Sequence, residues 1–418
     1  MKKSSTAFSR TDLLPVIVGG DISVYALGRQ FHEAFGVRSV ALGTGVIAAI
    51  EHSSIFDVRL VPDFAPKTLL AEVGRIANEL AEKRPGATVA LLANTDATIE
   101  DIISVRDELP DNVVCPVPDR RAFDLVSNKV SFARLCERHG LLTPATQIVS
   151  LAGEGGVPPT DLEFPVVAKP ASSAEYFSLL GRGFRKVYLM ESQEALDRLW
   201  SALREEGFAG DFLVQECVRG DDTHMGAITL YFGRDGEALL AGCAQTLLED
   251  HAPSLKGNAV AMVTRDFPEL VEKSVELLRS VGYRGFAEVD IKLDPRTGEW
   301  LFFEVNPRIG RNSYYLVAGG VNPMRVMVAD LVDHQRVVPV HATRRALYTL
   351  VPWALLRRYL SGRLLDEVSA LVSSGSVFDP QRYAPDMGIR RRVDVELTEM
   401  NHFRKFRRYY PKVSDTSF

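Results

Sequence analysis

Three polar residues in the last third of the chain have the types and the spacing of a site for a divalent metal ion. Asp290 lies in one apolar run, and Glu304 and Asn306 lie in the next, 304 − 290 = 14 residues further on. Because side chains alternate between the two faces of a strand, Glu304 and Asn306 share one face, whereas Phe303 and Val305 are expected on the other. Carboxylate and amide oxygens suit Mg²⁺, which also binds nucleotide phosphates. If the polar faces of the two runs coincide, three oxygen ligands converge.

The two runs are predicted to form a hairpin, since the residues between them are typical of a turn. They flank the pentapeptide DPRTG, in which Pro295 and Gly298 are turn residues. Arg308 and Arg311 follow directly and supply positive charge for anionic groups. The alternative is an ordinary amphipathic hairpin with a solvated acidic face, but the segment EVNPR at this distance from an aspartate favours the metal site.

Two lysines earlier in the chain stand where they could contact phosphate groups. Lys129 lies inside a helical stretch over residues 119–140, and Lys169 ends an apolar strand over residues 164–169. Two cations facing a triphosphate offset charge that would otherwise repel a second anionic substrate. The alternative for each lysine is a solvated surface side chain.

The loop after Lys169 has the composition of a phosphate-binding flap. It contains Ser172 and Ser173, followed by Gly181 and Gly183. Serine hydroxyls and backbone N–H groups bind phosphate oxygens. The three basic residues at the end of the loop are equally well explained as solvated side chains.

The order of these features over residues 120–333 resembles the ATP-grasp superfamily of carboxylate–amine ligases. Two lysines, an irregular glycine and serine loop, the segment QECVRGDD and the hairpin follow one another as they do in that superfamily. The resemblance implies ATP and Mg²⁺ as cofactors, with the nucleotide held between two α+β subdomains. It also implies roles for individual residues: Lys129, Lys169, Ser172 and Ser173 at the phosphates, Gln215, Glu216 and Val218 at the adenine, Asp222 at the ribose with Asp221 as the neighbouring alternative, Asp290, Glu304 and Asn306 at Mg²⁺, and Arg308 at the reacting carboxyl group.

The reaction implied by this resemblance has two steps. A substrate carboxylate attacks the γ-phosphate of ATP to form an acyl-phosphate, and an amine then attacks that carbonyl and expels phosphate to give an amide. Neither step needs a covalent enzyme intermediate, and the sequence contains no GxSxG elbow and no persuasive Cys–His pair.

Within the superfamily, the chain resembles the D-aspartate ligases in three stretches, which are residues 169–188, 248–258 and 306–323. This resemblance implies that the β-carboxylate of D-aspartate is joined to the lysine side-chain amine of a peptidoglycan precursor. Arg311 would bind the carboxylate that does not react. His251 and Asn258 would line the acceptor side, although His251 is equally well explained as a structural loop residue.

Other functions remain open at this point. The chain could be a ligase for another amino acid or small carboxylic acid, or a non-catalytic ATP-binding module. A basic C-terminus is the only feature that suggests nucleic-acid binding, and we expect no nucleic-acid partner. The oligomeric state cannot be inferred from the sequence.

The elements that must position these residues fall into three parts. Strands alternate with helices over residues 1–118, which predicts an N-terminal α/β domain with a Rossmann-like parallel sheet. Residues 119–333 are assigned to an ATP-grasp domain of α+β type, with a lid subdomain over about 143–213. Residues 334–418 form a basic C-terminal region, in which 353–373 is expected to be one helix.

Composition is that of an ordinary globular protein. The chain has 418 residues, of which 46% are hydrophobic and 25% charged. Four scattered cysteines without a CxxC pair indicate reduced thiols in a cytoplasmic protein. The net charge is −5, but residues 334–418 contain 15 Lys+Arg and 8 Asp+Glu, a balance of 15 − 8 = +7. This imbalance suggests a separate module or an anionic partner.

The last basic segment, residues 401–412, interleaves cations with aromatic residues. One interpretation is peripheral contact with an anionic surface, such as the inner face of the membrane or the pyrophosphate of a lipid-linked precursor. The other is a helix whose aromatic residues pack on the protein while its cations are solvated or pair with the acidic body. The segment contains Phe403, Arg404, Lys405, Phe406, Arg407, Arg408, Tyr409, Tyr410 and Lys412.

Overall fold

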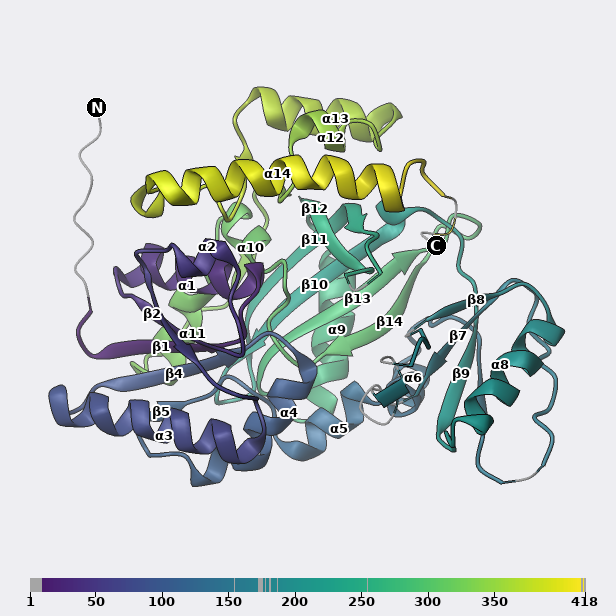
Figure 1. Ribbon diagram of the computed structural model, residues 1–418, viewed down its shortest axis with the longest axis horizontal. Coiled ribbons are helices and arrows are strands. Elements are labelled where there is room, and N and C mark those ends of the chain that lie inside the picture. Colours follow the sequence, from purple (N-terminus) through teal and green to yellow (C-terminus); the bar gives the residue numbers. More distant parts are fainter. Residues whose placement is uncertain are drawn as a thin grey trace.

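The computed structural model describes residues 10–416 except 154, 172–175, 177, 180, 181, 186, 254 and 415. Its strands form three sheets, and the helices are distributed around them (Figure 1). This mixed α/β architecture agrees with the predicted fold class.

The N-terminal sheet has five strands in the order β3-β2-β1-β4-β5, and all neighbouring strands are parallel. The predicted parallel pairing is therefore present. Helix α1 (Ile22–Phe35) packs on one face of this sheet, and α3 (Pro66–Lys83) and α4 (Asp96–Val105) pack on the other. The strands are β1 (Leu13–Val18), β2 (Ser39–Gly43), β3 (Phe56–Leu60), β4 (Thr88–Ala93) and β5 (Val113–Val114), and the short helices are α2 (Ala48–Glu51) and η1 (Arg106–Glu108).

Local sequence explains these helices. Asp21 accepts hydrogen bonds from the backbone N–H groups of Ser23 and Val24, so it caps the start of α1. In α3 the buried residues recur every three or four positions, as an amphipathic helix on a sheet requires. They are Leu69, Val73, Ile76, Ala77 and Leu80.

The second sheet has four strands in the order β6-β9-β7-β8, paired antiparallel. Helix α8 (Gln193–Glu205) covers it with Leu196, Leu199 and Trp200. The strands are β6 (Thr146–Ser150), β7 (Val166–Pro170), β8 (Tyr188–Met190) and β9 (Asp211–Glu216).

The third sheet is the largest, with eight strands. One face packs on the helices α5 (Arg120–Ser127), α6 (Lys129–Arg138) and α9 (Pro268–Ser280). The helices α10 (Tyr314–Ala318) and α11 (Pro323–Leu331) follow the hairpin. The strands are β10 (Met225–Phe232), β11 (Ala238–Asp250), β12 (Asn258–Arg265), β13 (Gly285–Leu293), β14 (Trp300–Asn306), β15 (Val340–Ala342), β16 (Leu347–Thr349) and β17 (Val377–Phe378).

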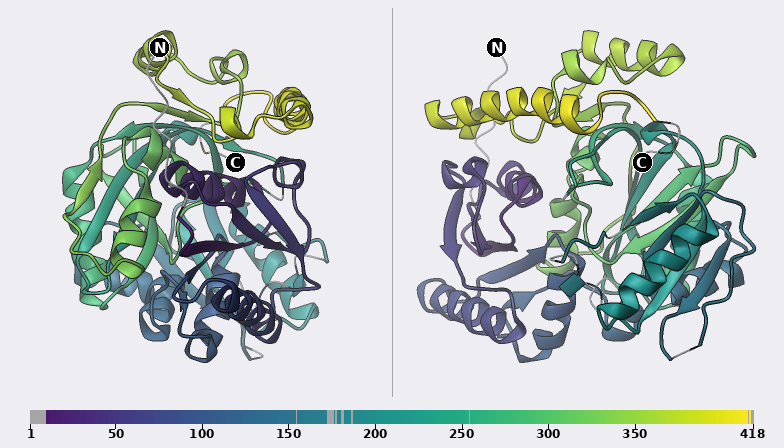
Figure 2. Two further views of the ribbon diagram at one scale, coloured as in Figure 1. Left: turned by 90° about the vertical axis from the view of Figure 1, so that its left-hand side faces the viewer. Right: turned by 45° about the vertical axis from the view of Figure 1, so that its right-hand side comes forward.

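The charge imbalance left open a separate C-terminal module, and this interpretation is wrong. Strand β15 pairs with β11, β16 pairs with β12, and β17 extends the sheet further. Helix α14 (Ile389–Tyr409) then crosses from the helices of the N-terminal sheet to the third sheet (Figures 1 and 2). The C-terminal region therefore extends the third sheet and connects it to the helices of the N-terminal sheet.

Two helices predicted as continuous are broken. The stretch 119–140 divides at Asn128, whose side chain accepts from the N–H groups of Val130 and Ser131 and so caps a new helix. The stretch 353–373 divides into α12 (Trp353–Leu356) and α13 (Gly362–Ser373). The remaining short helices are η2 (Asp222–His224) and η3 (Ala384–Asp386).

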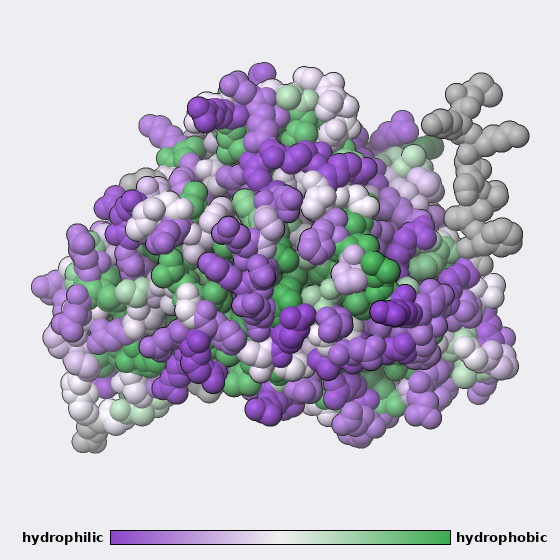
Figure 3. Space-filling model, turned by 180° about the vertical axis from the view of Figure 1, so that it is seen from behind, coloured by the Kyte–Doolittle hydropathy of each residue, from purple (hydrophilic) through white to green (hydrophobic). Residues whose placement is uncertain are grey.

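Among the described residues, no helix is long and apolar enough to cross a membrane. The face drawn in Figure 3 is mostly hydrophilic, with hydrophobic residues in small patches between polar ones.

Candidate active site

The predicted metal ligands lie together on the hairpin β13–β14. Asp290 stands directly opposite Glu304, and Glu288 stands opposite Asn306, so all four side chains share one face. The side-chain amide of Asn306 donates to Asp290 Oδ2 at 2.9 Å. Glu288 was missed by the sequence analysis, although it lies two residues before Asp290 and strand alternation places it on the same face.

One expectation about the hairpin is wrong. The register shifts beside Asp290, so β14 carries an extra residue at Phe303. Phe302 and Val305 are the residues that enter the core. The ring of Phe303 instead lies 6.0 Å from the Nζ of Lys169. The bulge therefore turns an aromatic ring towards the end of β7.

The electrostatics of this acidic face fit a bound cation. Burial, reinforced by Glu288 and Glu304, raises the pKa of Asp290 well above its usual range. Burial is also the main cause of the raised pKa of Glu288. Within the described residues, no three His, Cys, Asp or Glu side chains form a metal cage by themselves. The carboxylate and amide oxygens on this face suit Mg²⁺, which takes one or two carboxylates and completes its shell with phosphate oxygens and water.

Two arginines connect the acidic face to the N-terminal sheet. Arg308 Nε lies 2.9 Å from Asp96 Oδ1, and its Nη2 donates to Asn306 Oδ1 at 3.2 Å. Arg311 Nε lies 2.9 Å from Asp21 Oδ2. Both aspartates follow parallel strands, β1 and β4, at the carboxyl edge where open α/β sheets bind ligands.

Glycine is required between these arginines. A Cβ atom at Gly310 would collide with the Glu288 carboxylate. Glu288 Oε1 also lies 3.9 Å from Arg308 Nη1. Residues 308–311 are thus held against the acidic face from one side and against the N-terminal sheet from the other.

The two predicted phosphate lysines border the same hairpin. Lys169 is half-buried near the end of β7, next to Phe303. Lys129 is the first residue of α6, which packs beside β14. The third predicted phosphate element, Ser172 and Ser173, lies outside the described residues.

The predicted adenine segment ends β9 and is held by other parts of the chain. Gln215 is buried and donates to the Thr146 hydroxyl at 2.8 Å. Glu216 forms an ion pair with Arg296 of the β13–β14 turn. Val218 is buried immediately after the strand.

Asp222 is 2% exposed, and the chain itself satisfies its carboxylate. Asp222 Oδ2 accepts from the N–H of Glu249 at 2.8 Å and lies 2.9 Å from Nε2 of His251. Burial and the charge of Asp222 raise the pKa of Glu249 to about 8. The role of Asp222 at the ribose therefore stays a prediction.

The two residues predicted to line the acceptor side, His251 and Asn258, make different contacts within the protein. His251 stacks on Tyr410, with ring centroids 3.5 Å apart, and its side chain is 5% exposed. This packing agrees with the structural alternative for His251. Asn258 starts β12, and its side chain donates to the Leu255 carbonyl at 2.7 Å.

Comparison with protein families and curated proteins gives consistent matches. The model of "Carbamoyl-phosphate synthase L chain, ATP binding domain" matches residues 246–319. A D-aspartate ligase of Enterococcus faecium is 28% identical over 410 residues, which cover 96% of this chain and 97% of that protein. The carbamoyl phosphate synthase large chain of Pseudarthrobacter chlorophenolicus is 22% identical over 73% of this chain, which spans 28% of its length.

Solved structures share the fold at low sequence identity. N5-carboxyaminoimidazole synthetase from Staphylococcus aureus, complexed with ADP, has a TM-score of 0.55 at 11% identity, over 82% of each chain. The biotin carboxylase domain of the Hydrogenobacter thermophilus 2-oxoglutarate carboxylase, with MgADP, has a TM-score of 0.53 at 15% identity, over 79% of this chain and 72% of that one.

The hairpin motif, the shared fold and the likeness to a D-aspartate ligase along nearly the whole chain agree with one another. This chain is therefore similar along nearly its whole length to an ATP-grasp carboxylate–amine ligase, and its residues 246–319 match an ATP-binding domain.

Proposed function

We propose that this protein joins the β-carboxylate of D-aspartate to the lysine side-chain amine of a peptidoglycan precursor, with ATP and Mg²⁺ as cofactors. The observation that carries the proposal is the pair Arg308 and Arg311, held by Asp96 and Asp21 beside the acidic face. A dicarboxylic amino acid needs two cations, one for each carboxylate. Similarity to a D-aspartate ligase over 96% of the chain supports the same substrate.

In this proposal each group of residues has one task. Lys129 and Lys169 hold the phosphates, and Asp290, Glu304 and Asn306 would hold Mg²⁺. When bound, Mg²⁺ neutralises charge on the transferring phosphoryl group. Arg308 orients the reacting carboxylate and stabilises the charge that develops on its oxygen. The carboxylate first takes the γ-phosphate of ATP, and the amine then displaces phosphate from the acyl-phosphate.

The same proposal includes the wider organisation. Residues 1–118 would be a Rossmann-like pre-ATP-grasp domain, 119–333 the ATP-grasp domain, and 334–418 the C-terminal region. The acceptor would be met in the cytoplasm, close to the inner face of the membrane. These assignments draw on the parallel sheet, the hairpin and the basic C-terminal segment described above.

The direct test measures the product. The protein would be incubated with ATP, Mg²⁺, a lysine-containing peptidoglycan precursor and each of several acids, namely D-aspartate, L-aspartate, D-glutamate and D-alanine. A mass increase of one aspartyl residue, with stoichiometric ADP and only with D-aspartate, is expected. Product with another acid alone would favour the second candidate, a ligase for that acid, which the 28% identity leaves open.

Lys169→Ala is expected to weaken ATP binding while leaving the fold intact. The side chain is half-buried near the end of β7, facing the hairpin, so its loss removes a charge-assisted phosphate contact rather than core packing. Such a contact is worth about 1.5–3 kcal/mol, or about 10- to 150-fold in affinity. Calorimetric titration with ATP and Mg²⁺ measures it, and Lys273→Ala on the exposed side of α9 is the matched control. Equal affinities of the two variants would remove Lys169 from the site.

Arg311→Ala is expected to raise the KM for D-aspartate by about 10- to 150-fold with a smaller effect on kcat. The reason is that Arg311 would bind the carboxylate that does not react, and this contact is equally present before and during the reaction. Arg311→Lys keeps the charge and should recover part of the affinity. Steady-state kinetics with D-aspartate and with a monocarboxylic amino acid separate the effects, since loss of equal size for both acids contradicts this role.

A further inference from the structure

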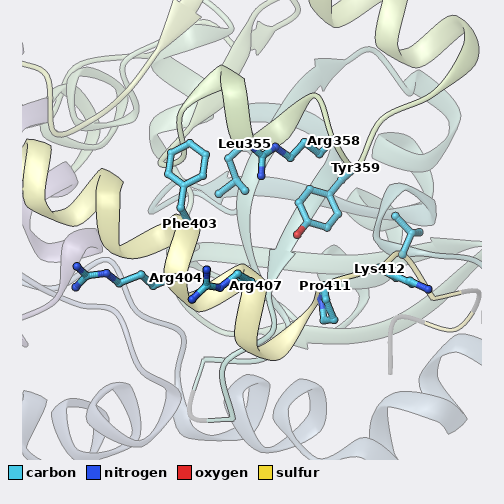
Figure 4. A pocket seen from close by; sticks show the side chains of 9 residues that line it. Leu355, Arg358, Tyr359, Phe403, Arg404, Arg407, Pro411 and Lys412 are labelled. Carbon is cyan, nitrogen blue, oxygen red and sulfur yellow. The ribbon is translucent and has the colours of Figure 1, made fainter.

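A cavity lies between the segment after α12, the C-terminal end of α14 and the residues that follow it. Its volume is about 440 Å³. Figure 4 shows Arg404 and Arg407 along α14, Arg358 on the opposite side, and Lys412 beyond the end of the helix. Among the residues that the structure describes, no acidic side chain lines the cavity. We propose that it binds a phosphate or diphosphate group carried by a ligand distinct from ATP.

The four cations are not needed for ion pairs within the protein. In the part of the chain that the structure describes, none of them pairs with a carboxylate, whereas neighbouring cations do. Lys405, on the same helix, turns inward to Asp250, and Arg382 pairs with Glu396 and Glu399. The body of the protein is acidic, so partners were available. Four like charges around one hollow repel each other, and an oxyanion would offset that repulsion.

The helix dipole explains only part of this cluster. Arg407 and Arg408 lie in the last turn of α14, where cations are favoured by the partial negative charge of the helix end. Arg358 comes from a different segment, and Lys412 lies beyond the helix, so neither gains from that turn. The helix dipole therefore does not explain why Arg358 and Lys412 also lie around the cavity. A shared anionic ligand would explain it.

The rest of the wall is apolar and suits the uncharged part of such a ligand. Side chains of Leu355, Tyr359, Phe403, Pro411 and Val413 complete the lining. Arg358 stands over the ring of Phe403 at 5.5 Å from its centroid. Guanidinium groups bind phosphate oxygens in a planar, two-point geometry while their stems lie on apolar surface. Charge and shape together favour an amphipathic phosphate ester, whether a soluble diphosphate or a lipid headgroup.

A series of residue contacts also links the cavity to Asp222, which is predicted to bind the ribose of the nucleotide. The hydroxyl of Tyr359 donates to the Tyr410 carbonyl at 2.7 Å, and the Tyr410 ring stacks on His251. His251 contacts Asp222, the predicted ribose residue. A ligand in the cavity would therefore lie against a segment that packs on the ATP-grasp domain.

Binding is tested in the full chain with Arg358→Gln/Arg407→Gln and with Arg408→Gln as the matched control. Arg408 is exposed in the same last turn but does not line the cavity. A chain cut at Met400 is a poorer variant, because it loses Phe406 and Tyr410, which are 2% and 5% exposed. Lys412→Gln is a second variant that leaves the packing of α14 untouched.

The first measurement is calorimetric titration with inorganic pyrophosphate in the absence of divalent cations. Binding is expected to persist in Lys169→Ala, which separates it from the nucleotide site. The double variant should lose at least about tenfold in affinity, and Arg408→Gln should change it little. Thermal unfolding checks that the variants are folded.

The second measurement is flotation with neutral vesicles and with vesicles containing an anionic phospholipid, at low and high salt. Loss in the double variant and in Lys412→Gln, but not in Arg408→Gln, assigns the phosphate to a lipid headgroup. No binding of either probe, or equal loss in the double variant and in Arg408→Gln, overturns the proposal. Because neither measurement involves turnover, failure here is distinct from failure of the proposed ligase reaction.

Discussion

A Glu304→Ala protein is expected to lose ligase turnover by at least about 100-fold. Glu304 stands opposite Asp290 on the buried acidic face, and the change removes a carboxylate while the phosphate charge of ATP remains. Loss of a residue that merely supports a metal ligand costs about 10–100-fold, so loss of a ligand itself should cost more. ADP release in the complete reaction, measured across Mg²⁺ concentrations, quantifies the effect.

The controls separate metal binding from folding. Glu299→Ala lies in the exposed turn of the same hairpin and should retain full turnover. Glu304→Asp keeps the carboxylate and should recover activity when Mg²⁺ is raised. Full activity of Glu304→Ala at low Mg²⁺ would mean that the acidic face is not the metal site.

The sequence was sufficient to place the three predicted metal ligands on one face of the hairpin, because the signals for this arrangement are local. The turn DPRTG fixes the hairpin, and alternation within β13 and β14 then places Asp290, Glu304 and Asn306 on one face. The same rule already implied Glu288. The alternation rule failed at Phe303, because a bulge interrupts the alternation in β14. No residue type in this strand indicates a bulge.

Contacts between distant segments could not be predicted. Asp96 and Asp21 lie 212 and 290 residues before the arginines that they pair with. The sequence analysis did not select these aspartates, and their place after parallel strands is the one signal that could have found them. Strand β12 was also missed, because it is buried on both faces and so lacks the alternation of a half-exposed strand.

The C-terminal region shows the same limit. The strands β15 and β17 contain three and two residues, too few for a periodic pattern. Their partners are residues far away in the sequence, so net charge was the main remaining signal. The net positive charge indicated a basic surface for this region, but it gave no information on how the region is attached to the third sheet.

An Arg308→Ala protein is expected to lose about 100- to 1,000-fold in kcat with any acid substrate. The Arg308 guanidinium donates to the side-chain oxygen Oδ1 of Asn306 and lies on the acidic face with its side chain 15% exposed. A cation there would act on charge that grows at the reacting carboxyl group. Removing one preorganised donor of that kind costs about 10²–10³ in kcat. Single-turnover formation of ADP and amide product measures the chemical step.

The paired variant Asp96→Asn distinguishes chemistry from domain contact. Asp96 holds Arg308 from the N-terminal sheet, so Arg308→Ala breaks this contact as well as removing the cation. If Arg308 acts mainly in catalysis, Asp96→Asn should keep most of kcat, and Arg308→Lys should recover only a part because it lacks the planar fork. If the contact between the N-terminal domain and residue 308 is what matters, Asp96→Asn should lose as much activity as Arg308→Ala, and the assignment of Arg308 to the reacting carboxyl group would be wrong.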